Sequence, residues 1–340
     1  MCMNLYRHID RNKVQFDFVK HTHSIGAFES EISDLGGRIY EAPRFKPGNI
    51  LRYKRWWRRH LSTHLEHQII HGHFFTISPI YFKIAKQKGR KTLGHIHISK
   101  AENIKKVIFA KFISRYTDFP FACSISAGKW VYGKRPFKVI NNAIDVDRFR
   151  FNDEKRTIVR NSFSFGENLV IGTVGRFDLQ KNPYGIFEIF CQLHELRKDT
   201  KLLWVGNGPF REELMIKAKK RGLDKDILFT GVRSDVNDLL QAMDIYIMPS
   251  FYEGLPVAAI EAQACGLPCF ISNQITNEVD ITGRCTFLPI KSPEKWANEI
   301  LNCKLKREDT GDIIIAAGYD INRTAKDIQD FYLSIVNSKN

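Results

Sequence analysis

Short runs of apolar and β-branched residues alternate along the chain with longer stretches in which apolar residues recur every three or four positions. The short runs predict strands and the longer stretches predict amphipathic helices. In the first half, strands are expected at 14–19, 37–41, 68–72, 91–98, 119–124 and 138–141. Helices are expected between them, at 27–35, 48–65, 76–88, 101–116 and 126–132.

The second half repeats this alternation, which is typical of parallel sheets. Its expected strands are 169–174, 201–205, 227–230, 245–248 and 268–271. Its expected helices are 183–196, 210–221, 235–242, 255–265 and 293–303, with a further amphipathic helix at 321–337.

We therefore predict an α/β fold of two Rossmann-like, doubly wound domains that face each other across a cleft. A short polar link at 144–152 separates the halves, so the expected domains are 1–146 and 147–320, followed by a C-terminal helix at 321–340. Ligands of such sheets bind beyond the carboxyl ends of the strands. The chemistry is therefore expected in loops that directly follow strands.

The composition fits this picture. A chain of 340 residues is long enough for two domains, and 43% hydrophobic with 26% charged residues is typical of a globular protein. No apolar run is long enough to cross a membrane, and the first residues do not resemble a signal peptide. The seven cysteines form no CxxC pair, which favours a reducing cytoplasm over a disulfide framework or a zinc knuckle.

Positive charge is concentrated in the first half of the chain. Residues 1–150 contain 28 lysines and arginines against 11 aspartates and glutamates, whereas the remainder contains 24 and 26. This asymmetry indicates that the first half faces an anionic partner, such as a phosphorylated lipid, an acidic glycan or a nucleic acid.

The expected helix at 48–65 carries much of this charge. Residues 44–59 include seven basic residues and no acidic one, and they surround Trp56 and Trp57. A basic amphipathic helix with aromatic residues is suited to an anionic membrane surface. The alternative is a helix that packs on its own sheet and exposes a solvated basic face.

A glycine turn with two cations follows the expected strand at 169–174. Gly175 and Arg176 come directly after the strand, and Lys181 lies just before a helix that starts at Pro183. Glycine lets the backbone approach a ligand, a helix N-terminus favours anions, and Arg and Lys supply charge-assisted hydrogen bonds. This arrangement is suited to a diphosphate, although two solvated surface cations are the simpler alternative.

Two weaker candidates follow the next strands. The strand at 201–205 ends in a turn that begins at Gly206, and the strand at 227–230 ends beside Val232 and Arg233. Exposed backbone there could contact a base, but tight turns need glycine in any case.

The strongest signal is a pair of glutamates eight residues apart, Glu253 and Glu261, in and just before an otherwise apolar helix. This spacing is close to two helical turns, so both side chains can lie on the same side. A carboxylate on a buried face needs a partner, and the hydroxyl groups of a ribose would supply one. The turn between them, Gly254-Leu255-Pro256, directs helix amides toward an anion. The alternative is a surface glutamate on an amphipathic helix.

In this order and on these elements, the motifs resemble those of the GT-B-fold, retaining glycosyltransferases of family 4, and more narrowly their bacterial capsule and exopolysaccharide branch. The resemblance covers most of the chain. It rests on Ile70-His71-Gly72-His73, Val139-Ile140-Asn141-Asn142 with Ile144-Asp145, the segment 175–183, and the pair Glu253 and Glu261.

The resemblance implies a role for each candidate. Arg176 and Lys181 would hold the donor diphosphate beside Gly175 and Gly206, and Glu261 would hold the ribose hydroxyls. Glu253, with the backbone of Gly254, Leu255 and Pro256, would hold the sugar and stabilise developing charge. Backbone at Val232 and Arg233 would face the base. No metal ion and no cofactor are expected; the co-substrate is a nucleotide-sugar, with UDP expected and GDP as the alternative.

Histidines are dense in the first half, and two pairs fall at expected strand ends: His71 with His73, and His95 with His97. By resemblance, one of them contacts the transferred sugar, with His97 the first choice and His95 the second. Alternation along a strand puts both members of a pair on one face, so the sequence does not separate them. A zinc site is the competing interpretation, but no Cys or Asp completes a ligand set.

Two departures from the family pattern stand out. Residues 1–9 are expected to form the helix that normally follows an opening strand and a glycine-rich loop, so that strand and loop are expected to be missing. Ala143 also stands where the family has glycine.

The expected function is the retaining transfer of a sugar from a UDP-sugar to a lipid-linked oligosaccharide, in capsule or exopolysaccharide synthesis, on the cytoplasmic face of the cell membrane. Because of the missing strand, an inactive glycan- or lipid-binding subunit is the alternative. Nucleic-acid binding is not expected, since the chain contains no recognition motif for it.

Overall fold

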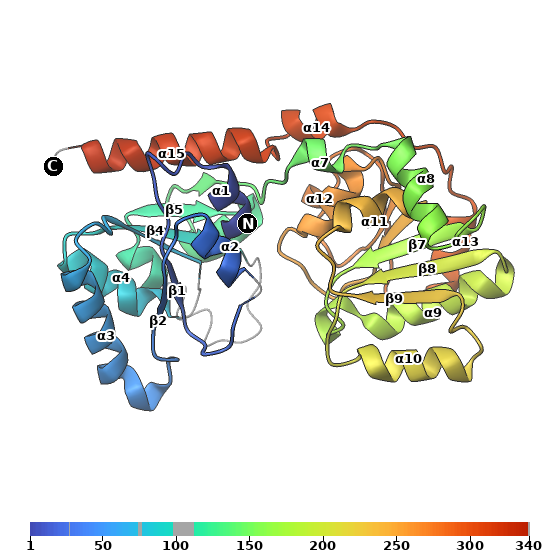
Figure 1. Ribbon diagram of the computed structural model, residues 1–340, viewed down its shortest axis with the longest axis horizontal. Coiled ribbons are helices and arrows are strands. Elements are labelled where there is room, and N and C mark those ends of the chain that lie inside the picture. The colour runs from blue at the N-terminus through green and yellow to red at the C-terminus, as the bar shows by residue number, and fades with distance from the viewer. Residues whose placement is uncertain (27, 74–76, 98–111, 339–340) are drawn as a thin grey trace. The chain divides into compact units, whose positions relative to one another are not determined.

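The computed structural model describes residues 1–26, 28–73, 77–97 and 112–338. The chain divides into two compact units (Figure 1). Unit 1 comprises Met1–Ala143 and Ile321–Asn340, and unit 2 comprises Ile144–Asp320. The sequence pattern places the first boundary a few residues later, and the family resemblance implies that the helix at 321–340 crosses back to the N-terminal domain.

Unit 2 is built on a six-stranded sheet in which every described pair is parallel. The strand order is β12-β11-β10-β7-β8-β9. The strands are β7 (Leu169–Val174), β8 (Thr200–Val205), β9 (Ile227–Gly231), β10 (Ile245–Met248), β11 (Cys269–Ser272) and β12 (Cys285–Leu288). Their near-continuous burial is that of a sheet covered on both faces.

Helices cover both faces of this sheet. α9 (Pro183–Leu196), α10 (Arg211–Lys220) and α13 (Pro293–Leu301) contribute to one apolar cluster that includes Phe187, Trp204 and Trp296. α8 (Asp153–Ser162) packs against α11 (Val236–Ala242), and α12 (Val257–Ala264) packs on β10 and β11. The short helices α7 (Val146–Phe149) and α14 (Gly311–Ala316) complete the unit. Unit 2 is therefore a doubly wound, Rossmann-like domain.

Unit 1 contains two groups of parallel strands. β3 (Ile69–Gly72), β4 (Lys91–Ile96), β5 (Phe119–Ala122) and β6 (Lys138–Val139) form one sheet in chain order. β1 (Phe18–Lys20) and β2 (Ile39–Glu41) form a separate pair among the described residues. Its helices are α1 (Cys2–His8), α2 (Glu29–Asp34), α3 (Ile50–Thr63), α4 (Ser78–Gln87) and α6 (Ile125–Tyr132).

The last helix of the chain, α15 (Ile321–Asn337), belongs to unit 1, where it packs against α1 (Figure 1). Its buried residues Ile321, Ala325, Ile328, Tyr332 and Ile335 recur at helical spacing. They join Leu5 and Tyr6 of α1, and Leu93 and Phe121 of the sheet, in one core cluster. The C-terminal helix is therefore part of the unit 1 core.

Most predicted elements are present. The predictions are wrong for β12, α7, α8 and α14, which the sequence pattern leaves out, and the predicted strand at 14–19 begins too early. Most of the predicted helix at 101–116 lies outside the described residues, because 98–111 are not described. All seven cysteines are free. In the part of the chain that is described, no helix combines the length and apolarity needed to cross a membrane.

Candidate active site

The order of strands in unit 2 reverses between β7 and β10. From β7 the chain moves outward through β8 and β9, then returns to β10 on the other side of β7 and continues to β11 and β12. In such sheets a ligand crevice forms beyond the carboxyl ends of the two strands at the reversal. The segment 175–182 follows β7, and the segment 249–256 follows β10. The topology therefore brings the two strongest sequence motifs to the same edge of the sheet.

Hydrogen bonds tie these two loops together. Asn182 lies in the left-handed region, with φ 53° and ψ 57°, and its Oδ1 accepts from the Gly185 N–H at the start of α9. Its Nδ2 donates to the Pro249 carbonyl at 3.1 Å. Next to it, the Gln180 carbonyl accepts from the Phe251 N–H at 2.9 Å. The loop after β7 is therefore held directly on the loop after β10.

Lys181 and Glu253 meet across this junction. The Lys181 Nζ lies 2.6 Å from Glu253 Oε1, and the two side chains are 22% and 8% exposed. Gln180 Nε2 donates to the other carboxylate oxygen of Glu253 at 3.1 Å. Lys181 from the loop after β7 and Glu253 from the loop after β10 thus form one ion pair that is largely shielded from solvent.

Arg176 lies in the same loop but points outward. Its side chain is 77% exposed, and its ion partner is Asp178 at 3.5 Å. The neighbouring Gly175 leaves room for Lys181, since a Cβ there would lie 3.3 Å from Lys181 Cε. Arg176 is therefore free to bind an anion, while Lys181 is held in place by Glu253.

Gly206 connects the ends of three strands. Its φ of +137° is outside the range that side-chain-bearing residues adopt, and a Cβ would overlap the Gly175 carbonyl oxygen. Its N–H donates to the Gly231 carbonyl at 2.8 Å. The turns after β7, β8 and β9 can approach this closely only because residue 206 has no side chain.

Glu261 lies inside α12, where its carboxyl group is largely shielded although part of the residue reaches the surface. Burial raises the pKa of Glu261 to about 7. Among the described residues, none donates a hydrogen bond to this carboxylate. Burial raises the pKa of Tyr246 in β10, and the charges of Cys269, Glu253 and Glu261 add to this effect.

Ser250 is a site residue that sequence reasoning misses. It is the second residue after β10 and is fully buried, and its Oγ has no hydrogen-bond partner among the described residues. It lines a small cavity together with Gly175, Arg176 and Lys181. Its place two residues after a buried strand is the signal that could have identified it. Gln180 and Asn182 are also missed, because their contacts are made to a loop far away in the sequence.

The remaining predicted donor residues lie around this position. Val232 is exposed after β9, and the Arg233 side chain pairs with Asp235 at 2.6 Å, which leaves the backbone of this turn accessible. Gly254, Leu255 and Pro256 lead into α12, with Pro256 as the N-cap and Leu255 buried.

In unit 1, His71, His73, His95 and His97 form one group of stacked rings at the ends of β3 and β4. Successive ring centroids are 4.4 Å apart for His71–His73 and for His95–His97, and 5.4 Å apart for His71–His95. His73 Nδ1 and His97 Nε2 share a hydrogen bond of 2.9 Å, and His71 Nδ1 shares one of 2.5 Å with the Tyr332 hydroxyl.

Burial keeps these four imidazoles neutral. It lowers the pKa of His71 to about 3 and that of His97 to about 4, and it also lowers the pKa values of His73 and His95. His95 is buried, whereas His97 is partly exposed. Of the two preferred candidates, His97 is therefore the one whose ring a ligand could reach.

Comparisons with known proteins indicate the class of protein to which the chain is similar. Residues 154–314 match the family described as glycosyl transferases group 1. The chain is 29% identical over 352 residues to EpsF of Bacillus subtilis (strain 168), a protein named as a glycosyltransferase, and the alignment covers 98% of this chain and 92% of EpsF. It is 31% identical over 226 residues to a UDP-Gal:alpha-D-GlcNAc-diphosphoundecaprenol alpha-1,3-galactosyltransferase of Escherichia coli, covering 59% of this chain and 55% of that enzyme.

Solved structures show a similar fold. HepE of Anabaena, solved with UDP and glucose, superposes with a TM-score of 0.79 at 17% sequence identity, and the match covers 98% of this chain and 95% of HepE. A glycosyltransferase from Rickettsia africae superposes with a TM-score of 0.76, also at 17% identity, over 99% of this chain and 94% of that chain. These matches confirm the predicted α/β class with two Rossmann-like domains.

Proposed function

We propose a donor, an acceptor and a mechanism for this chain, which is a glycosyltransferase with a group 1 domain in its second unit. The proposed reaction moves a sugar from a nucleotide-sugar, with UDP as the nucleotide, to a lipid-linked oligosaccharide in capsule or exopolysaccharide synthesis. Transfer retains the anomeric configuration and needs no metal ion.

The observation that carries the proposal is the Lys181–Glu253 pair at the edge of the sheet where the strand order reverses. Lys181 and the exposed Arg176 offer positive charge to a diphosphate, and Glu253 offers a carboxylate to a sugar a few ångströms away. A nucleotide-sugar contains both groups in this order. The half-buried Glu261, whose carboxylate accepts no hydrogen bond among the described residues, is suited to the two hydroxyls of a ribose.

The pairing of Lys181 with Glu253 suggests how the donor is engaged. An entering diphosphate competes with Glu253 for the Lys181 ammonium, and this releases a carboxylate oxygen toward the sugar. Lys181 and Arg176 then neutralise the charge that grows on the leaving diphosphate, and Glu253 stabilises the positive charge that grows on the sugar. We propose no protein nucleophile.

Two relatives support the choice of donor and acceptor. The Escherichia coli relative is named for a UDP-sugar donor and a diphosphoundecaprenol-linked acceptor, and the HepE structure contains UDP and glucose. A Salmonella typhi relative named for Vi polysaccharide biosynthesis favours a role in polysaccharide synthesis.

Donor binding can be tested by thermal unfolding with UDP-, GDP- and ADP-sugars. At about 100 times its dissociation constant, the correct donor should stabilise the chain by about 2.7 kcal/mol, which corresponds to a rise of roughly 5–10 °C. Glu261→Ala should abolish the rise, whereas Glu299→Ala, on the exposed side of α13, should keep it. A folded protein that responds to none of the three donors would refute the proposed donor site.

The same titration has an expected pH dependence. Ribose hydroxyls donate to a carboxylate, so donor binding requires ionised Glu261. Because burial raises the pKa of Glu261 to about 7, binding below that pH must also remove a proton. Donor affinity should therefore fall about tenfold for each pH unit below 7 and level off above it, and Glu261→Ala should remove this dependence.

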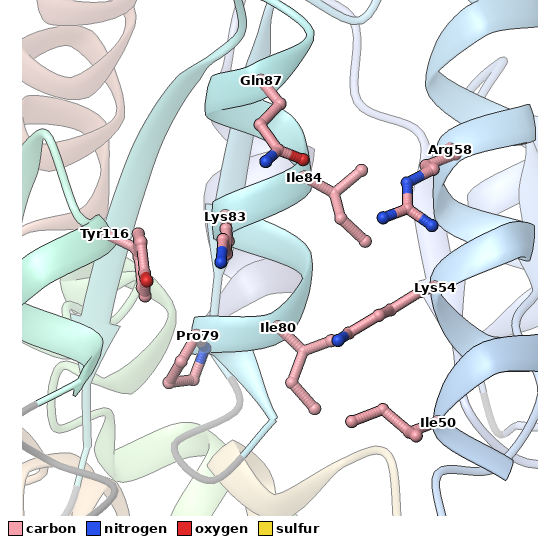
Figure 2. A pocket seen from close by; sticks show the side chains of 9 residues that line it. All are labelled: Ile50, Lys54, Arg58, Pro79, Ile80, Lys83, Ile84, Gln87 and Tyr116. Atoms are coloured by element: carbon pink, nitrogen blue, oxygen red, sulfur yellow. The ribbon is translucent and has the colours of Figure 1, made fainter.

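We also propose that α3 contacts an anionic membrane surface. Figure 2 shows a pocket between α3 and α4, into which Lys54 and Arg58 extend from α3. The pocket measures about 240 Å³, and its lining combines three cations with apolar side chains and no acidic residue: Ile50, Lys54, Arg58, Pro79, Ile80, Lys83, Ile84, Gln87 and Tyr116. Leu51, beside it on α3, is 74% exposed. Cations around an apolar surface are suited to anionic lipid headgroups.

Membrane contact can be measured by sedimentation with phosphatidylglycerol vesicles. Replacing Lys54, Arg58 and Lys83 by glutamine should weaken binding by roughly 100-fold or somewhat more, since each basic residue at an anionic surface contributes about 1 kcal/mol. The matched control replaces the exposed Lys129, Lys134 and Lys138 of the same unit. Equal loss in both variants would show a general effect of net charge rather than contact through α3.

A further inference from the structure

A second group of histidines lies at the C-terminal end of α3. His60 and His64 are four residues apart and so lie on one face of the helix end. His67, three residues further along the chain, places its ring beside both of them. Their ring centroids are 4.3 Å apart for His60–His64 and 5.2 Å apart for the other two pairs. One nitrogen from each ring lies within 4.8 Å of the other two. Three potential ligand atoms therefore converge from a short segment of chain.

Hydrogen bonds fix the tautomers of two of these rings. His64 Nδ1 lies 2.9 Å from the His60 carbonyl, which can only accept, so Nδ1 carries the proton and Nε2 carries the lone pair. His67 Nε2 lies 2.8 Å from Asp17 Oδ2. The same carboxylate accepts from the Arg38 N–H at 2.9 Å and from Arg38 Nε at 3.0 Å, so it is the acceptor of the bond from His67. His67 Nδ1 therefore carries a lone pair.

His60 completes the group. It is buried and stacks on Trp56, with centroids 4.8 Å apart and planes 8° apart. Its ring also lies against both His64 and His67. A neutral imidazole offers one lone pair, so the three rings together can supply three ligand nitrogens to one cation.

We propose that His60, His64 and His67 bind a divalent transition-metal ion of the zinc class, and that Asp17 orients His67. Imidazole nitrogens are good zinc ligands, and a carboxylate bound to the far nitrogen of a ligand histidine is a common support for such sites. Tetrahedral zinc requires ligand nitrogens about 3.3 Å apart, which small rotations of the rings can supply.

Such a site departs from the expectation of no metal. The sequence offers no Asp or Cys beside the histidines, and Asp17 is 50 residues from His67 along the chain. The fold alone brings it there, because Asp17 directly precedes β1. The ion would fasten the end of α3 to the β1–β2 pair. The proposed metal site is independent of the proposed sugar transfer, because the residues proposed to bind the donor all lie in unit 2.

The test is calorimetric titration of zinc chloride into the full chain without a histidine tag. We expect one ion per chain, with tetrahedral d–d absorption bands when cobalt replaces zinc. His64→Gln should abolish this binding. Asp17→Asn should weaken it about 10- to 100-fold while leaving the cobalt bands in place, as expected for a positioning residue.

Two control variants make the result specific. His23→Gln removes an exposed histidine of unit 1 and should bind zinc like the parent chain. His73→Gln removes a member of the other histidine group and should do the same. The proposal is overturned if the folded chain does not bind zinc, if His64→Gln binds it unchanged, or if His73→Gln rather than His64→Gln abolishes binding.

Discussion

Replacing Lys181 with methionine is expected to lower kcat by about 10²- to 10³-fold, the usual cost of losing one charged group that stabilises a transition state. Methionine has a similar volume, so the change removes the charge and little packing. It also removes the 2.6 Å ion pair with Glu253, whose carboxylate is 8% exposed, and some loss of stability is therefore expected as well. Steady-state kinetics and thermal unfolding of the same preparation measure both effects.

The chain contains a matched control for this change. Lys201 Nζ lies 2.6 Å from Asp226 Oδ1, and both side chains are similarly shielded, but this pair is at the opposite end of β8 from Gly206. Lys201→Met should therefore lower stability to a similar degree while sparing kcat. Equal loss of activity in the two variants would mean that Lys181 acts only through the fold.

Gly206→Ala is expected to have the largest effect on stability, lowering the free energy of unfolding by about 3–5 kcal/mol. The backbone at this position has φ +137°, and the added methyl would overlap the Gly175 carbonyl oxygen. Backbone cannot rotate away as a flexible side chain can, so the turns after β7 and β8 must separate. Chemical denaturation measures the loss, and donor binding should weaken with it, because the turn after β7 carries Arg176 and Lys181.

Gly222→Ala separates the two causes of this loss. Gly222 also has a positive φ, of +70°, but no atom lies within 4 Å of the position a Cβ would take. Its substitution should cost only about 1–2 kcal/mol for the backbone conformation. If the two variants unfold at the same denaturant concentration, the close approach at Gly206 is not important for stability.

The sequence predicts best the helices and strands whose bounds are determined by their own residues rather than by distant contacts. β7 and β10 are short, mostly apolar runs, and α9 begins at a proline after a capping asparagine, so their bounds match the prediction. α8 is different, because its residues are mostly polar. It is held by contacts distant in sequence: Arg156 and Arg160 both bind Asp244, and Arg160 also donates to the Ala242 carbonyl. Its local signals are the capping Asn152, two acidic residues in the first turn and Arg160 in the last turn, without a clear apolar stripe.

The same distinction applies to the candidate site. Arg176, Lys181, Glu253 and Glu261 occur in motifs with a defined spacing, so the sequence identifies them. The spacing does not show that Lys181 and Glu253 are bonded to each other, nor that Gln180 holds the second carboxylate oxygen. Those contacts follow from the adjacency of β7 and β10, which only the order of strands in the sheet determines.

The position of α15 in the unit 1 core has a consequence for synthesis on the ribosome. Unit 2 is continuous in sequence, so it can fold as soon as residues 144–320 have left the ribosome. Unit 1 begins at the N-terminus, yet its core is closed by Ile321, Ile328 and Tyr332 near the other end of the chain. The half that is translated first therefore completes its fold last, and until release it exposes apolar surface that chaperones would bind.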